Sequence, residues 1–156
     1  MSTVEAKKIL IIEDNPQYLK AVEHQIGLEG FITFTSQDGL SGLNLARRLK
    51  PDLIVLDLML PSMDGYKVCR FLKFDRRLRT IPIVVLTSLD TEADADLAKL
   101  TRADAFLVKT VRPAILRDVI RRLILNENHI ENKKILFQGE GQEIEKYLSV
   151  VPGSIL

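Results

Sequence analysis

The sequence predicts an α/β domain built on a doubly wound, five-stranded parallel sheet with five helices. Short apolar runs rich in Val, Ile and Leu alternate along the chain with segments whose apolar residues recur every three or four positions. The apolar runs are mostly continuous, which is typical of parallel strands that are covered on both faces. Right-handed crossovers between such strands produce a doubly wound sheet.

The strands are expected where β-prone residues form the longest uninterrupted apolar runs. These runs are Lys8–Ile12, Phe31–Thr35, Leu53–Leu58, Ile81–Thr87 and Ala105–Val108. Each run has four to eight residues, the usual length of a strand. The sequence therefore predicts five strands in this order.

The helices are expected in the segments between and after these strands. Their apolar stripes are Leu19/Val22/Ile26, Leu40/Leu43/Leu45–Leu49, Val68/Phe71/Leu72, Leu97/Leu100 and Ile115/Val119/Leu123. Pro16 fits the first turn of the first helix, and Asp38 and Asp64 fit N-caps. Gly30 and Pro51 follow the first two helices, where such residues commonly end a helix.

Length and composition suit one globular domain, expected at residues 1–126, with a short appendage at 127–156. The 22 basic and 21 acidic residues nearly cancel, which argues against a surface built throughout for nucleic acid or acidic membrane. Cys69 has no partner for an internal disulfide, and no apolar run reaches membrane-spanning length. A soluble cytoplasmic protein is expected.

Polar residues that could bind a metal ion or take part in a reaction lie at the ends of four of the five predicted strands. Glu13 and Asp14 follow the first strand, Asp57 interrupts the apolar stretch "LIVLDLMLPSMDG", Thr87 ends the fourth strand and Lys109 follows the fifth. In doubly wound sheets the ligand site lies beyond the carboxyl ends of the strands. We therefore expect these five side chains to converge on one edge of the sheet.

Such a cluster has a definite chemistry. Neighbouring carboxylates repel one another unless a cation lies among them, and an all-oxygen site suits magnesium or manganese. A carboxylate beside that ion, with a hydroxyl and an ammonium nearby, is equipped to become an acyl phosphate. Asp57 is the predicted nucleophile.

The motifs "IIEDNP", "LIVLDLMLPSMDG", "IPIVVLTS" and "ADAFLVK" resemble the response-regulator receiver domain of two-component signalling, a flavodoxin-like fold, over residues 7 to about 126. The resemblance implies that Asp57 accepts a phosphoryl group from a sensor histidine kinase or phosphotransfer protein. It also implies that Glu13, Asp14, Asp57 and the backbone carbonyl of Met59 hold the metal.

The same resemblance assigns the remaining site residues. Lys109 would pair with the phosphoryl group, and Thr87 and Phe106 would form the switch whose rearrangement changes partner binding. Met59 and Leu89 stand two residues after Asp57 and Thr87, where the family tunes phosphate lifetime. Both are apolar and cannot orient a water molecule, so slow autodephosphorylation is expected.

Two positions depart from the family pattern. Lys109 is followed by Thr110 where the family usually has proline, so a trans bond and a less certain aim of Lys109 are expected, with the fifth helix starting near Pro113. Arg102 stands where the family commonly has glycine, so the fourth helix is expected to end differently or to fray. Both changes lie on the face that commonly transmits the signal.

The function of two segments outside the predicted site has more than one interpretation. "KFDRRLRT" (Lys73–Thr80) is expected to be a solvated face rather than a nucleic-acid site. Residues 127–156 combine a polar linker, a possible strand and a possible helix, and could be a docking appendage, a dimerisation arm or the start of a truncated output domain. A homodimer could form through this tail or through the predicted fourth helix, fifth strand and fifth helix.

Other functional classes are less consistent with the sequence. A haloacid-dehalogenase-type phosphatase needs a second acid where Met59 stands, and a dinucleotide site needs glycines where "EDNPQ" follows the first strand. The remaining alternative is a pseudo-receiver, a binding module whose Asp57 stays unmodified. The leading interpretation is a signalling phosphoacceptor that catalyses only its own phosphorylation and dephosphorylation.

Overall fold

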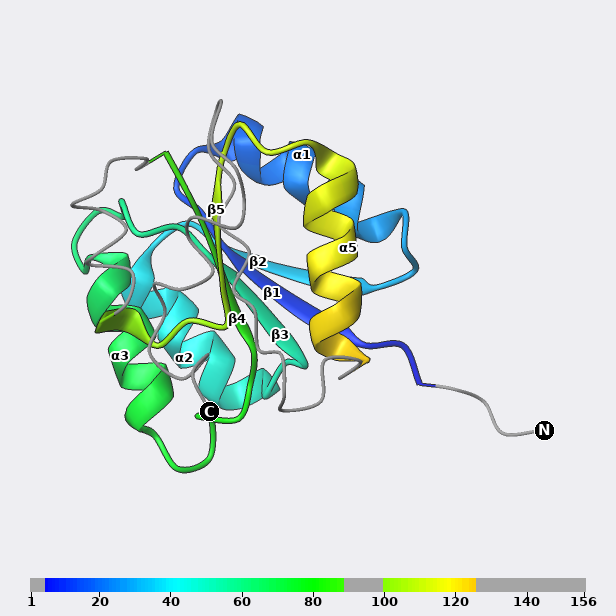
Figure 1. Cartoon of the computed structure of the whole chain (residues 1–156). Coiled ribbons are helices and arrows are strands. Elements are labelled where there is room, and N and C mark those ends of the chain that lie inside the picture. Colours follow the sequence, from blue (N-terminus) through cyan, green and yellow to red (C-terminus); the bar gives the residue numbers. More distant parts are fainter. Residues whose placement is uncertain (1–4, 89–99, 126–156) are drawn as a thin grey trace.

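The computed structural model describes residues 5–88 and 100–125. Its core is one parallel sheet with the strand order β2-β1-β3-β4-β5 (Figure 1). The strands are β1 (Lys8–Ile12), β2 (Ile32–Ser36), β3 (Leu53–Leu56), β4 (Ile83–Thr87) and β5 (Ala105–Val108). The order reverses between β1 and β3, so the predicted doubly wound fold is confirmed.

Helices cover both faces of this sheet. They are α1 (Pro16–Gly27), α2 (Gly39–Leu49), α3 (Gly65–Phe74) and α5 (Pro113–Ile124). The pair α1 and α5 covers one face, and the pair α2 and α3 covers the other (Figure 1). The fourth predicted helix falls largely outside the described residues, although Leu100 and Thr101 are helical. The predicted appendage, residues 127–156, lies outside them entirely.

Helix starts follow the sequence closely. The side chain of Asp38 accepts a hydrogen bond from Ser41 N and that of Asp64 accepts one from Lys67 N, so both predicted N-caps are confirmed. α5 begins at Pro113, as expected. Asn15, which the sequence did not single out, caps α1.

The turn after β3 is held by a close backbone approach. Gly65 N donates a hydrogen bond to Leu58 O at 2.9 Å. A Cβ at Gly65 would lie 2.2 Å from the Asp57 carbonyl oxygen, so only glycine fits where α3 begins. This contact fixes the backbone immediately after Asp57.

The two departures from the family pattern have different outcomes. The Lys109–Thr110 peptide is trans, as expected. Arg102 has φ 58°, so this non-glycine residue adopts the left-handed conformation at the end of the helix. The expectation that the helix ends differently was therefore wrong, whereas fraying concerns residues that largely lie outside the described ones. The Arg102 guanidinium lies 5.6 Å from the centre of the Phe74 ring.

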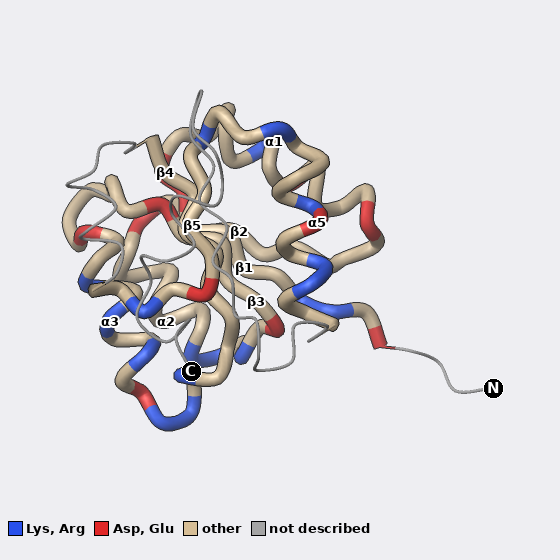
Figure 2. Tube along the Cα trace, in the orientation of Figure 1, with Lys and Arg blue, Asp and Glu red and all other residues tan. Residues whose placement is uncertain are grey.

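The basic stretch after α3 is only partly a solvated face. Figure 2 shows Lys and Arg positions gathered along α3 and the loop that follows it, and Arg76, Arg77 and Arg79 are exposed. Lys73 differs, because its Nζ lies 2.7 Å from Oδ2 of Asp104 and its side chain is only 10% exposed. The expectation of a solvated charge was therefore wrong for Lys73, whose ammonium joins α3 to the start of β5.

No described helix is both long and apolar enough to cross a membrane.

Candidate functional site

Backbone hydrogen bonds continue past the strand ends and fix the predicted site residues. Glu13 N donates to Ser36 O at 3.0 Å, and Asp57 N donates to Ile12 O at the same distance. Lys109 N donates to Thr87 O at 2.8 Å. The carboxyl ends of β1, β3, β4 and β5 therefore meet at one edge, as the sequence predicted.

Three carboxyl groups form a cluster that could hold a metal ion. One carboxylate oxygen from each of Glu13, Asp14 and Asp57 lies within 4.8 Å of the others. Glu13 and Asp57 are each 3% exposed, whereas Asp14 faces solvent. The donors are all oxygen and one side is open to water, which fits magnesium or manganese. Asp57 Oδ1 also accepts a hydrogen bond from Met59 N at 3.1 Å, so the Met59 backbone borders the cluster.

Lys109 supplies the cation of this site. Its Nζ donates to Glu13 Oε1 at 2.6 Å and to Asp57 Oδ2 at 3.0 Å. The Lys109 side chain is 20% exposed, so the ammonium is only partly hydrated. The trans bond to Thr110 has thus not turned Lys109 away from Asp57.

The charges in the site shift one another's protonation. Burial and the neighbouring Asp57 raise the pKa of Glu13 to about 7, although Lys109 acts in the opposite direction. Burial lowers the pKa of Lys109, but its hydrogen bonds to Glu13 and Asp57 outweigh that effect and raise the pKa overall. A proton would therefore compete with a metal ion for Glu13 near neutral pH.

The predicted switch residues lie in the interior. Thr87, at the end of β4, is fully buried and pairs in the sheet with Val108. Phe106 is 1% exposed and pairs with Val85, two residues before Thr87. Both side chains are therefore buried in this structure.

Of the two residues predicted to tune the phosphate lifetime, Met59 is described by the structure and Leu89 is not. Met59 is 55% exposed, and the hydroxyl of Ser88 donates to its sulfur at 3.5 Å. This contact joins the turn after β3 to the end of β4, so the Met59 side chain leans toward the residue that follows Thr87. Leu89 lies outside the described residues.

Sequence reasoning missed Tyr18. Its hydroxyl donates to the Lys109 carbonyl at 3.3 Å, and the Lys109 ammonium lies 4.6 Å from its ring centre. Burial and the negative charges of Glu13 and Asp57 raise the pKa of Tyr18, so the hydroxyl stays a donor at any working pH. The available signal was an aromatic residue in the first turn after an acidic pair, a position that topology brings to the same edge as Lys109.

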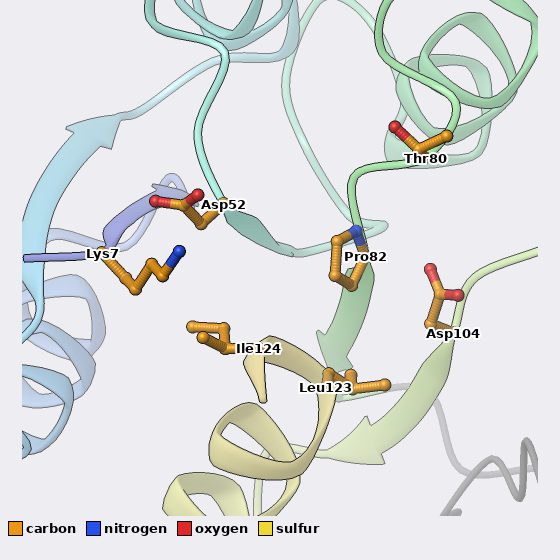
Figure 3. A pocket seen from close by; sticks show the side chains of 7 residues that line it. All are labelled: Lys7, Asp52, Thr80, Pro82, Asp104, Leu123 and Ile124. Atoms are coloured by element: carbon orange, nitrogen blue, oxygen red, sulfur yellow. The ribbon is translucent and has the colours of Figure 1, made fainter. Parts of the chain in front are cut away.

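A separate cavity of about 240 Å³ lies at the amino ends of the strands (Figure 3). Its two carboxylates are used within the fold, because Asp52 accepts from Lys8 N and Asp104 pairs with Lys73. It lies away from the acidic cluster, at the other end of the strands.

Comparison with known proteins agrees with this arrangement. The family model described as the response regulator receiver domain matches residues 9–121. The DNA-binding dual master transcriptional regulator RpaA of Synechocystis is 35% identical over 136 residues, covering 85% of this chain and 56% of RpaA. The chain spans about half the length of the curated relatives it matches.

Two solved structures show the same fold. The signal receiver domain of a Syntrophus aciditrophicus histidine kinase has a TM-score of 0.74 and 33% identity, covering 80% of this chain and 94% of that one. The receiver domain of the Pseudomonas aeruginosa sensor kinase PA1611 has a TM-score of 0.72 and 28% identity, covering 77% and 98%. The latter was solved with magnesium coordinated in its active-site cleft.

Proposed function

Because this chain belongs to the response-regulator receiver family of two-component systems, we propose that it is a switch driven by phosphorylation of Asp57. The phosphoryl donor is the phosphohistidine of a sensor histidine kinase or phosphotransfer protein. The observation that most supports this is the Lys109 ammonium, 3.0 Å from Asp57 and beside the three-carboxylate cluster.

In the proposed reaction, an Asp57 carboxylate oxygen attacks the phosphorus atom and the nitrogen–phosphorus bond of the donor breaks. The imidazole ring, protonated on its other nitrogen before transfer, keeps the electron pair of the broken bond, so the products are an acyl phosphate on Asp57 and a neutral histidine. A magnesium ion held by Glu13, Asp14, Asp57 and the Met59 carbonyl would neutralise charge on the phosphoryl oxygens. Lys109 would exchange its Asp57 contact for a phosphoryl oxygen and stabilise the remaining charge.

Thr87 and Phe106 would transmit the phosphorylation state of Asp57 to the surface of the domain. Thr87 ends β4 and Phe106 lies on the neighbouring strand, so a hydroxyl drawn toward the phosphoryl group changes the packing around the ring. This would alter the face containing β5 and α5, to which partners or a second copy of the chain could bind. The chain would catalyse only its own phosphorylation and dephosphorylation.

The direct test is to incubate the protein with magnesium and acetyl phosphate and to record intact mass and sedimentation. We expect a gain of one phosphoryl mass that hydroxylamine removes, as for an acyl phosphate, and no gain in Asp57→Asn. Asp14→Asn should keep Asp57 but lose labelling through weaker metal binding. A folded wild-type protein that takes no label would favour the pseudo-receiver instead.

A further inference from the structure

We infer that Tyr18 is a positioning residue that holds Lys109 in line with Asp57, an inference that rests on the proposed phosphorylation of Asp57. Tyr18 touches Lys109 at two places. Its hydroxyl binds the Lys109 carbonyl at 3.3 Å, and its ring lies 4.6 Å from the Lys109 ammonium. The backbone and the charged end of Lys109 are thus both held by one side chain.

The backbone contact restrains a turn that has little else to stiffen it. Thr110 follows Lys109 and is exposed, and unlike proline it leaves φ free to vary. Lys109 N and Val111 N bind Thr87 O and Val108 O, which are both local to the end of the sheet. The Tyr18 hydroxyl adds a tie from α1, across 91 positions of sequence, to the peptide that enters Thr110.

The ring contact restrains the ammonium itself. A lysine side chain has four rotatable bonds, so attraction to two carboxylates leaves several arrangements open. The Tyr18 ring offers a negative face that attracts the ammonium and also blocks one side of it. The ammonium is therefore confined between that ring and the oxygens of Glu13 and Asp57.

Tyr18 is itself well placed to act as a rigid support. Its backbone N–H donates to Asn15 Oδ1 at 3.0 Å, within the N-cap of α1. Its side chain is half-buried and packs against the core. The cap and the core together fix the start of the side chain, so its position is transmitted to Lys109.

Three variants separate positioning from general packing. Tyr18→Leu removes ring and hydroxyl, Tyr18→Phe removes the hydroxyl alone, and Phe31→Leu is a matched loss of a half-buried aromatic ring before β2, at the other end of the sheet. With acetyl phosphate, we expect the maximal labelling rate to fall about tenfold in Tyr18→Leu and about threefold in Tyr18→Phe. Phe31→Leu should keep the wild-type rate.

Magnesium affinity distinguishes a loss of Lys109 positioning from general damage to the acidic cluster, because only the latter should weaken magnesium binding. The hydrogen bond and the ring contact of Tyr18 are both made with Lys109, which is not one of the proposed metal ligands, so magnesium affinity should change less than about twofold in each variant. A labelling rate and a magnesium affinity that fall together would mean that the acidic cluster has collapsed, which would overturn the inference.

The position of Lys109 can be followed without any phosphorylation. Protons near the Lys109 ammonium lie over the Tyr18 ring, so their NMR resonances should be shifted upfield in the wild type and in Tyr18→Phe, and should lose that shift in Tyr18→Leu. If the resonance does not respond to Tyr18→Leu, the inference is wrong, whatever the labelling rate. If it responds but the wild type takes no label, Tyr18 positions Lys109 and the proposed function fails. Wild-type labelling that Tyr18→Leu leaves unchanged would also overturn the inference.

Discussion

The Lys109 ammonium lies 2.6 Å from Oε1 of Glu13, a side chain that is only 4% exposed. This ion pair does not fully offset the cost of burying the carboxylate beside Asp57, because the pKa of Glu13 is still raised to about 7. The proposed metal site therefore holds a proton in part of the molecules at neutral pH. Two properties of the protein should depend on that proton.

Magnesium affinity should increase with pH through neutrality. Magnesium needs the ionised carboxylate, and a pKa of about 7 means that most Glu13 is protonated at pH 6. The dissociation constant for magnesium, measured by titration calorimetry, should fall roughly eightfold as the pH rises from about 6 to 7.5. Glu13→Gln should bind magnesium more weakly with a flatter pH profile. An unchanged wild-type affinity across this range would contradict the prediction.

The same proton gives stability a definite pH dependence without magnesium. In the unfolded chain Glu13 loses its proton near its ordinary value of 4.5, whereas in the folded state it keeps it until about pH 7. The folded state binds more protons between these values, so this group's contribution to the free energy of unfolding falls as pH rises from 4.5 to 7 and then levels off. The free energy of unfolding, measured by urea titration at several pH values, should therefore fall more steeply with pH in the wild type than in Glu13→Gln over this range.

Asp57→Asn should stabilise the protein when magnesium is absent. The charge on Asp57 raises the pKa of Glu13, so removing it relieves a repulsion between two buried acids. We expect a gain of about 1 kcal/mol in urea unfolding at pH 7.5. Magnesium should reduce the gain, because the ion offsets the same repulsion in the wild type. The exposed Asp14, changed to Asn, serves as control and should alter stability less; destabilisation by Asp57→Asn would contradict this account.

A second ion pair makes a structural prediction. Lys73 Nζ lies 2.7 Å from Asp104 and also donates to Ile81 O at 3.1 Å, so it ties α3 to the residue directly before β5 and to the segment that leads into β4. Lys73→Met should cost about 3 kcal/mol, since it leaves a largely buried carboxylate without its cation.

Two further variants test that explanation. Arg77→Met, in the same basic stretch, removes a side chain that is 75% exposed and should cost less than about 0.5 kcal/mol. Adding Asp104→Asn to Lys73→Met should recover part of the loss, because the amide oxygen can still accept from Ile83 N. Equal losses in Lys73→Met and Arg77→Met would show that the ion pair has no special role.

The sequence predicted the residues whose position depends on strand order alone. Asp57 and Lys109 follow apolar strands, and parallel strands end at one edge, so their meeting needed no knowledge of side-chain packing. Tyr18 could not be assigned in that way, because its contact with Lys109 depends on how α1 sits over the end of β5.

Other errors have similar physical causes. Lys73 belongs to a run of charges that is typical of a solvated face, and its partner Asp104 lies 31 positions away. Arg102 was expected to avoid a left-handed conformation on the basis of backbone cost alone. The structure places its guanidinium over Phe74, a contact between separate elements that offsets part of that cost.

Met59 gives a prediction about the lifetime of the proposed phosphoryl group. The exposed thioether of Met59 accepts a hydrogen bond from the Ser88 hydroxyl. The backbone N–H of Met59 donates to Asp57 Oδ1, so the residue lies beside the proposed phosphoryl group. A thioether is a poor partner for an attacking water, so phosphorylated Asp57 should decay slowly. Met59→Asn places an amide that can orient water there and should speed the loss of label about tenfold, whereas Met59→Leu should leave it near the wild-type rate. The decay is measured by intact mass after removal of acetyl phosphate. A wild-type lifetime of seconds, or equal rates in both variants, would mean that Met59 does not limit the access of water.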